Sequence, residues 1–81
     1  MTSAIDVYRK LPVSTDQEAE LVARLAKLGG RLDCREETSI PGVCSTLCLT
    51  FEFSDYSQAE TAAGTLQSNG EHVEGPYSYG D

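Results

Sequence analysis

The spacing of apolar side chains constrains the fold of this chain more than any other feature. Residues 4–11 alternate apolar and polar side chains, which is typical of a strand with one buried face. Residues 14–30 and 54–70 instead carry apolar residues at helical spacing. Two further stretches of alternating apolar and polar residues lie between the two helical segments. A shorter stretch of this kind follows the second helical segment. The sequence therefore predicts the element order β-α-β-β-α-β.

Both helical segments carry recognisable start signals and one apolar stripe. The candidate capping residues are Ser14 with Gln17, or Thr15 with Glu18, for the first helix, and Ser54 or Asp55 for the second. The stripes expected to face the core are Leu21, Leu25 and Leu28 in the first helix and Tyr56, Ala59, Ala63 and Leu66 in the second. Because the second stripe is mostly alanine, we expect that helix to lie close to a sheet.

The middle strands are expected to form a hairpin whose register follows from Pro41-Gly42, a pair suited to the centre of a turn. If only these two residues form the loop, the apolar residues of both strands share one face. On that face Leu32 meets Phe51, Cys34 meets Leu49, and Glu36 meets Leu47. On the opposite face Arg31 meets Glu52, Asp33 meets Thr50, and Arg35 meets Cys48.

This order of elements resembles the ferredoxin-like sandwich, an α+β fold with a four-stranded antiparallel sheet and two helices on one face. The resemblance implies that the first and third strands lie in the centre of the sheet. The length of 81 residues predicts a single domain over 1–81. We expect an ordered core over about 4–75, a last strand broken near Gly75-Pro76, and a C-terminal tail over 76–81.

The net charge limits the classes of partner that this protein is expected to bind. Thirteen acidic and six basic residues give a net charge of −7, which disfavours nucleic acid and anionic membranes as partners. No segment is apolar enough to span a membrane, and the first ten residues lack the pattern of a signal peptide. Together with three cysteines, an odd number, these features predict reduced thiols and a cytoplasmic location.

Cys44 and Cys48 could indicate a metal or redox site. On a strand, two residues four apart share a face but lie roughly 13 Å apart, too far for a disulfide or a shared metal. The expected register turns Cys34 toward the core. We therefore expect structural thiols, no metal site and no cofactor, although a dimer that pairs sheet faces could bring Cys48 close to its mate.

Catalytic and RNA-binding patterns are also missing. Nucleophile motifs, phosphate-binding glycine patterns and paired histidines do not occur, so His72 is expected to be a surface residue and the protein not an enzyme. RNA-binding relatives of this topology carry aromatic residues on the two central strands. The equivalent positions here are Tyr8, Thr46, Cys48 and Thr50.

The remaining candidate is the sheet face that the helices leave open. Its expected members are Asp6, Tyr8, Arg31, Asp33, Arg35, Thr46, Cys48, Thr50 and Glu52, with Tyr77 and Tyr79 from the C-terminal segment. A small-residue surface with tyrosines suits protein contact, so we expect an adaptor, regulator or inhibitor that acts through this face or an edge strand on another protein or on itself. Two alternatives stay open: a homodimer with a small-molecule pocket or modest catalysis, and a thiol metal-binding protein.

Overall fold

The structure is a computed structural model that describes residues 2–39 and 45–79. Six elements follow one another along the chain. They are β1 (Thr2–Lys10), α1 (Thr15–Lys27), β2 (Arg31–Thr38), β3 (Thr46–Phe53), α2 (Tyr56–Ser68) and β4 (His72–Tyr79). The predicted β-α-β-β-α-β order is confirmed.

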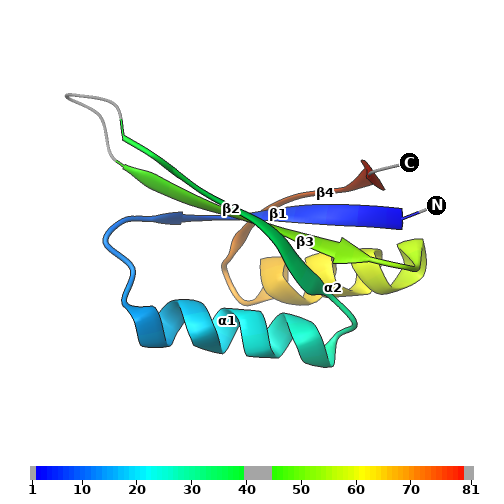
Figure 1. The fold of residues 1–81 in the computed structure, drawn as a ribbon. Helices are drawn as coiled ribbons and strands as arrows, with labels where there is room; N and C mark the ends of the chain where they lie inside the picture. Colours follow the sequence, from blue (N-terminus) through cyan, green and yellow to red (C-terminus); the bar gives the residue numbers. More distant parts are fainter. Residues whose placement is uncertain (1, 40–44, 80–81) are drawn as a thin grey trace.

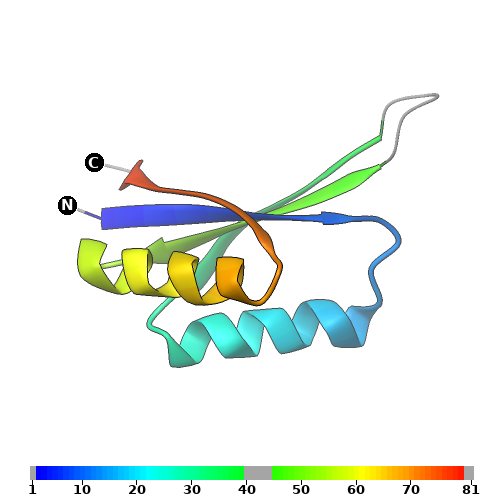
Figure 2. The same cartoon turned by 180° about the vertical axis from the view of Figure 1, so that it is seen from behind.

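The strands form one antiparallel sheet in the order β2-β3-β1-β4, with both helices on the same side (Figure 1). The view from behind shows the opposite face of the sheet without a helix (Figure 2). The predicted ferredoxin-like arrangement, with the first and third strands in the centre, is therefore confirmed. Strands β2 and β4 form the two edges. Neither helix in the described part of the chain has the length and apolar character needed to cross a membrane.

Each helix starts at one of its candidate caps. The Ser14 hydroxyl accepts from the Gln17 backbone N–H, and the Gln17 side chain accepts from the Ser14 N–H, which completes a capping box. Asp55 caps α2 by accepting from the Ser57 backbone N–H at 3.0 Å. These bonds satisfy amides that a helix start otherwise leaves without partners.

The core lies between the sheet and the two helices. Its largest fully buried side chains are Phe51, Phe53, Ile5, Leu21, Leu25, Leu47, Leu49, Leu66 and Val7. Three alanines of α2 are buried as well, which lets that helix approach the sheet closely. Tyr56 does not join them, because its side chain at the start of α2 is 54% exposed, so its predicted place in the core is wrong.

Strand β4 does not end where the sequence suggested. The pairing with β1 shifts between Glu74 and Tyr77, so Gly75 and Pro76 together lie opposite one residue of β1, Ile5. Gly75 has a φ of 108°, and a side chain there would meet the Ala4 carbonyl oxygen at 2.9 Å. The bulge absorbs the Gly75-Pro76 break, and the strand continues to Tyr79. The prediction of a tail from residue 76 is therefore wrong.

The β2–β3 register is confirmed at its first two pairs and wrong beyond them. Arg31 lies opposite Glu52 and Leu32 opposite Phe51, as expected. A bulge at Asp33 then shifts the pairing by one residue, so Cys34 lies opposite Thr50. Because side chains alternate between faces, one extra residue moves every later side chain of β2 to the other face.

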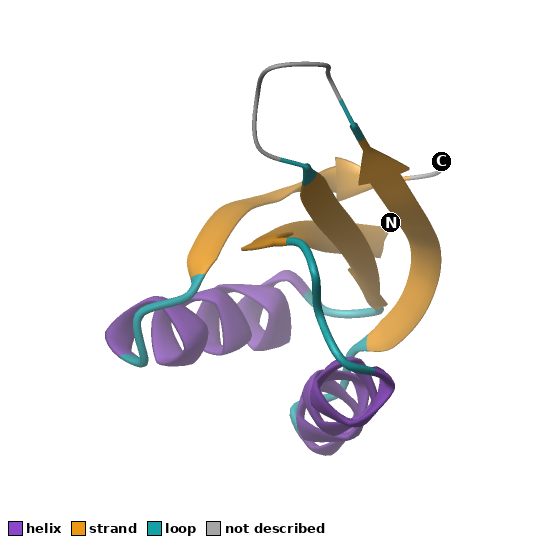
Figure 3. Ribbon diagram, turned by 90° about the vertical axis from the view of Figure 1, so that its left-hand side faces the viewer, coloured by secondary structure: helices purple, strands orange, loops and turns teal. Residues whose placement is uncertain are grey.

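The far halves of β2 and β3 bend away from α1 (Figures 1 and 2). An end-on view shows the helices well separated beneath the sheet, with α1 below the β2 side and α2 below the β4 side (Figure 3). Strand β2 consequently lies largely outside the helix layer. Seven of its eight residues are exposed, and only Leu32 is partly buried.

Candidate functional site

The open face of the sheet gathers most of the residues predicted for it. Pairing across the strands places eight of them on the side away from the core: Asp6, Tyr8, Arg31, Thr46, Cys48, Thr50, Glu52 and Tyr77. Strand β1 supplies two of these residues and β3 supplies four. The open face therefore has largely the composition that the sequence predicted.

The centre of the open face is a hydrogen-bonded cluster. One carboxylate oxygen of Asp6, Oδ1, accepts from Thr50 Oγ1 at 2.7 Å and from the Tyr77 hydroxyl at 2.9 Å. At the margin, Arg31 forms an ion pair with Glu52. These polar groups already have protein partners, so the centre of the open face offers few free groups to a ligand.

Tyr8 and Cys48 are held in their neutral forms. Partial burial, with smaller contributions from Cys48 and Asp6, raises the pKa of Tyr8 to about 12. Burial, followed by the charge of Asp6, also raises the pKa of the Cys48 thiol. Because the thiolate is the nucleophilic form, the raised pKa makes Cys48 a weak nucleophile at neutral pH.

Three of the predicted open-face residues need separate treatment. Arg35 is on the helix-facing side, opposite Leu49, so its predicted place on the open face is wrong. Asp33 is the extra residue of the β2 bulge. Tyr79 lies opposite Thr2 at the end of β4, and its side chain is not described.

The same bulge reverses the predicted faces of Cys34 and Glu36. Cys34, expected to face the core, is exposed and free on the open face. Glu36 joins it there opposite Cys48, while Glu37 lies on the helix side opposite Leu47. Cys44 and the Pro41-Gly42 turn lie outside the described residues. Within residues 2–39 and 45–79, no three histidine, cysteine or acidic side chains are placed to share a metal ion.

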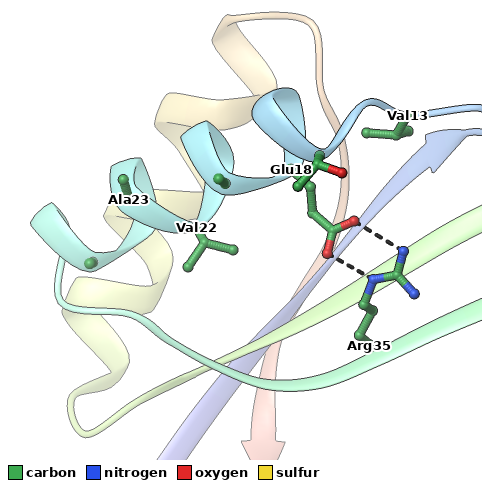
Figure 4. Close-up of a pocket in the computed structure, with 8 residues that line it drawn as sticks. Val13, Glu18, Val22, Ala23 and Arg35 are labelled. Atoms are coloured by element: carbon green, nitrogen blue, oxygen red, sulfur yellow. Dashed lines mark hydrogen bonds and ion pairs between the residues drawn. The ribbon is translucent and has the colours of Figure 1, made fainter.

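A groove that the sequence did not predict lies between α1 and the helix-facing side of β2. Eight residues line it: Val13, Thr15, Glu18, Ala19, Val22, Ala23, Ala26 and Arg35 (Figure 4). Most of the lining comes from one flank of α1, where apolar residues follow each other at i, i+3, i+4 and i+7 from Ala19. That spacing is visible in the sequence, but only the tertiary structure shows that this second stripe faces an open groove.

Arg35 closes one end of the groove by bonding to α1. Its Nε donates to Glu18 Oε2 at 2.7 Å and its Nη2 to Glu18 Oε1 at 3.1 Å (Figure 4). Arg35 Nη1 also lies 2.6 Å from a carboxylate oxygen of Glu37. The bond from Arg35 lowers the pKa of Glu18, and the bonds to Glu18 and Glu37 raise the pKa of Arg35.

A second, smaller hollow lies where β1 meets the start of β4 on the open face. It is lined by Tyr8, Arg9, Lys10, Thr46 and His72. The rings of Tyr8 and His72 meet edge to face, with centroids 5.3 Å apart. His72 is exposed, as expected of a surface residue, and its ring also contacts Tyr8. Cys48 lies opposite Tyr8 on β3.

Comparisons with protein-family models, with curated protein sequences and with solved structures give no match to this chain, so the geometry of these surfaces alone guides the functional interpretation.

Proposed function

We propose that the protein is a non-catalytic interaction module that binds another polypeptide along the β2 edge and the adjoining groove. The observation that carries this proposal is the exposure of β2 on both of its faces, together with its place at the end of the sheet. An edge strand presents a row of backbone N–H and C=O groups that an added strand can pair with. The groove lies beside this row and can receive side chains of the added strand.

The β2 edge supports this function better than the open face does. On the open face, Asp6, Thr50 and Tyr77 already bond to one another, so a partner there would compete with existing contacts. On the edge, the backbone groups that point away from β3 face no further strand of the described sheet. Apolar side chains of α1, such as Val22, line the groove together with Arg35 of this strand.

The free thiols of Cys34 and Cys48 fit a reducing compartment, and we place the module in the cytoplasm. Cys34 is exposed on the proposed binding strand. An exposed thiol of this kind persists in its reduced form where glutathione and thioredoxin systems operate.

A site-specific crosslinking experiment tests the proposal. A photo-crosslinking amino acid replaces Glu36 on β2 in one variant and Glu60 on α2 in a matched control, because both are exposed glutamates. Illumination in the cells that naturally make the protein should give a discrete adduct from position 36 and none from position 60. Mass spectrometry of the adduct then identifies the bound polypeptide.

Side-chain variants separate the edge from the open face. Arg35→Ala should reduce the adduct yield several-fold, because Arg35 is at the junction of edge and groove. Tyr8→Phe on the open face should leave the yield unchanged. Equal losses in both variants, or no adduct from position 36, would contradict binding at the edge.

The cluster around Tyr8 supports a second candidate function, the binding of a small molecule. It combines an aromatic pair, the hydroxyl of Thr46 and the ammonium of Lys10 around one hollow. A screen of small aromatic carboxylates by two-dimensional NMR would test it. Shifts centred on Tyr8 and His72 that disappear in Tyr8→Ala would support this function, and the absence of localised shifts would count against it.

A further inference from the structure

We infer that the polypeptide bound at the β2 edge is a second copy of this chain, paired antiparallel with Glu36 at the two-fold axis. This inference rests on the proposed function, since it names the partner of the same edge. It assigns the register of the pairing as well as the partner. Both follow from the placement of five residues, Cys34 to Thr38.

The alternation of side chains restricts the possible registers. Cys34, Glu36 and Thr38 point to the open face, whereas Arg35 and Glu37 point to the helix side. Two copies that extend one sheet across a two-fold axis must keep each face continuous. A residue can therefore lie opposite only a residue of its own face, and the registers that pair at least three of these five residues are centred on Arg35, on Glu36 or on Glu37.

Charge distinguishes these three registers. Centring on Arg35 places two arginines directly opposite each other, and centring on Glu37 places two glutamates opposite each other on the helix side. Centring on Glu36 instead places Arg35 of each copy opposite Glu37 of the other, so the Arg35–Glu37 ion pair within each chain is extended into a network of alternating charges across the axis. Opposite charges on facing residues stabilise a strand pair, and like charges destabilise it. The Glu36 register is thus the complementary one.

The open face of the same register carries its single unfavourable contact. The two Glu36 side chains lie opposite each other there, flanked by Cys34 opposite Thr38 on both sides. Glu36 is exposed to solvent, which moderates the repulsion between the two carboxylates. Because the two carboxylates repel each other, we expect that removing the charge of Glu36 strengthens the pairing of the two β2 strands.

The helix layer supports the same arrangement. A two-fold axis perpendicular to the sheet places α1 of both copies on the same side of the joined sheet. Arg35, next to the axis, bonds to Glu18 in the first turn of α1, so the N-terminal end of each α1 is the part of the helix nearest the partner. Contact at these ends would cover the part of the groove lined by Val13 and Ala19.

A charge-swap experiment tests both the partner and the register. Arg35→Glu and Glu37→Arg are each expected to weaken the wild-type dimer about tenfold or more, measured by sedimentation equilibrium. An equimolar mixture of the two variants should recover the affinity, because each glutamate then faces an arginine of the other chain. Recovery in the mixture cannot arise from contacts within one chain.

Matched controls carry the same charge changes away from the edge. Arg24→Glu alters a residue whose ion pair is with Glu20 on α1, and Glu60→Arg alters an exposed residue of α2. Both should dimerise like the wild type. If either edge variant fails to fold by circular dichroism, Glu36→Gln still decides the question, since it should tighten the dimer about two- to fivefold.

Three outcomes would overturn the inference. They are a wild-type chain that remains monomeric at millimolar concentration, single edge variants that dimerise like the wild type, and a mixture that does not recover. If the crosslink from position 36 then joins the chain to a different protein, the edge still binds a polypeptide and only the second copy is rejected. If no crosslink forms from position 36, the proposed function fails as well.

Discussion

The two edge strands of the sheet, β4 and β2, differ in how readily a further strand could pair with them. Strand β4 carries a bulge at Gly75, a proline without a backbone N–H, and a helix packed below it. Strand β2 is regular from Cys34 to Thr38, contains no proline, and extends past the helix that should cover it. A regular edge accepts an added strand, whereas a bulged edge with proline resists one.

The ties between each edge and its helix differ in the same sense. Near β4, the Gln67 side chain of α2 donates to the Val73 carbonyl at 3.3 Å. Arg9 of β1 also donates from Nε at 3.1 Å to Oε1 of Glu71, which lies between α2 and β4, in a partly buried ion pair. At β2, the tie to α1 is the more exposed pair of Arg35 and Glu18. This difference indicates that β4 is held more firmly in place than β2.

The largest expected effect on stability comes from replacing Gly75, the glycine in the bulge of β4. Gly75→Ala should lower the free energy of unfolding by about 2–4 kcal/mol, because alanine disfavours a positive φ and its Cβ would press on the Ala4 carbonyl. Chemical denaturation measures the change. A loss below about 1 kcal/mol would mean that β4 tolerates a regular backbone there.

Gly64→Ala is the matched control for this substitution. Gly64 lies within α2, and a Cβ there meets no atom within 4 Å. Alanine should raise the free energy of unfolding by about 0.5–1 kcal/mol, because glycine lowers the stability of a helix interior. The opposite signs of the two changes separate the effect of the bulge from that of adding a methyl group.

The next largest effect is expected from the ion pairs near the two edges, which should contribute differently to stability. Glu71→Gln should cost about 1–2 kcal/mol of folding free energy, since it weakens charge-assisted bonds to a partly buried Arg9. Glu18→Gln should cost less, because its partner Arg35 is more exposed and retains Glu37. Equal losses on thermal denaturation would contradict the difference between the edges.

Alkaline pH should act on the part of the sheet next to β4. The pKa of Tyr8 is raised to about 12 in the folded chain, so the unfolded chain loses this proton first, near pH 10. Stability should therefore decline from about pH 10 up to the folded pKa, by less than about 1.4 kcal/mol at pH 11. Tyr8→Phe should flatten this decline, and a decline that persists in the variant would assign it to other groups.

Acidic pH should act on the β2 side, with the smallest effect. The bond from Arg35 lowers the pKa of Glu18 in the folded chain. The contribution of this pair is present above the ordinary glutamate pKa and is lost as the pH falls through the lowered value. Glu18→Gln should remove that part of the acid dependence, whereas the control Glu60→Gln should not.

Local sequence determined where the helices begin, most of the residues that face the core, and the order of the elements. Capping at Ser14 and Asp55, apolar spacing and the central place of β1 and β3 could all be predicted, because they depend on residues within a few positions or on the handedness of connections. The open face around Asp6 and Thr50 followed from the same alternation.

Tertiary structure decided the placement of β2 and the end of β4. Without the bulge at Asp33, Glu36 would face Leu47 and Cys34 would face Leu49. With it, Arg35 reaches Glu18 on α1, a bond that sequence spacing cannot reveal because it depends on where that helix lies. In the same way, Gly75-Pro76 suggested an end, but pairing with β1 continues the strand. Periodicity fixes which residues share a face within a segment, whereas contacts between distant segments decide where that alternation shifts.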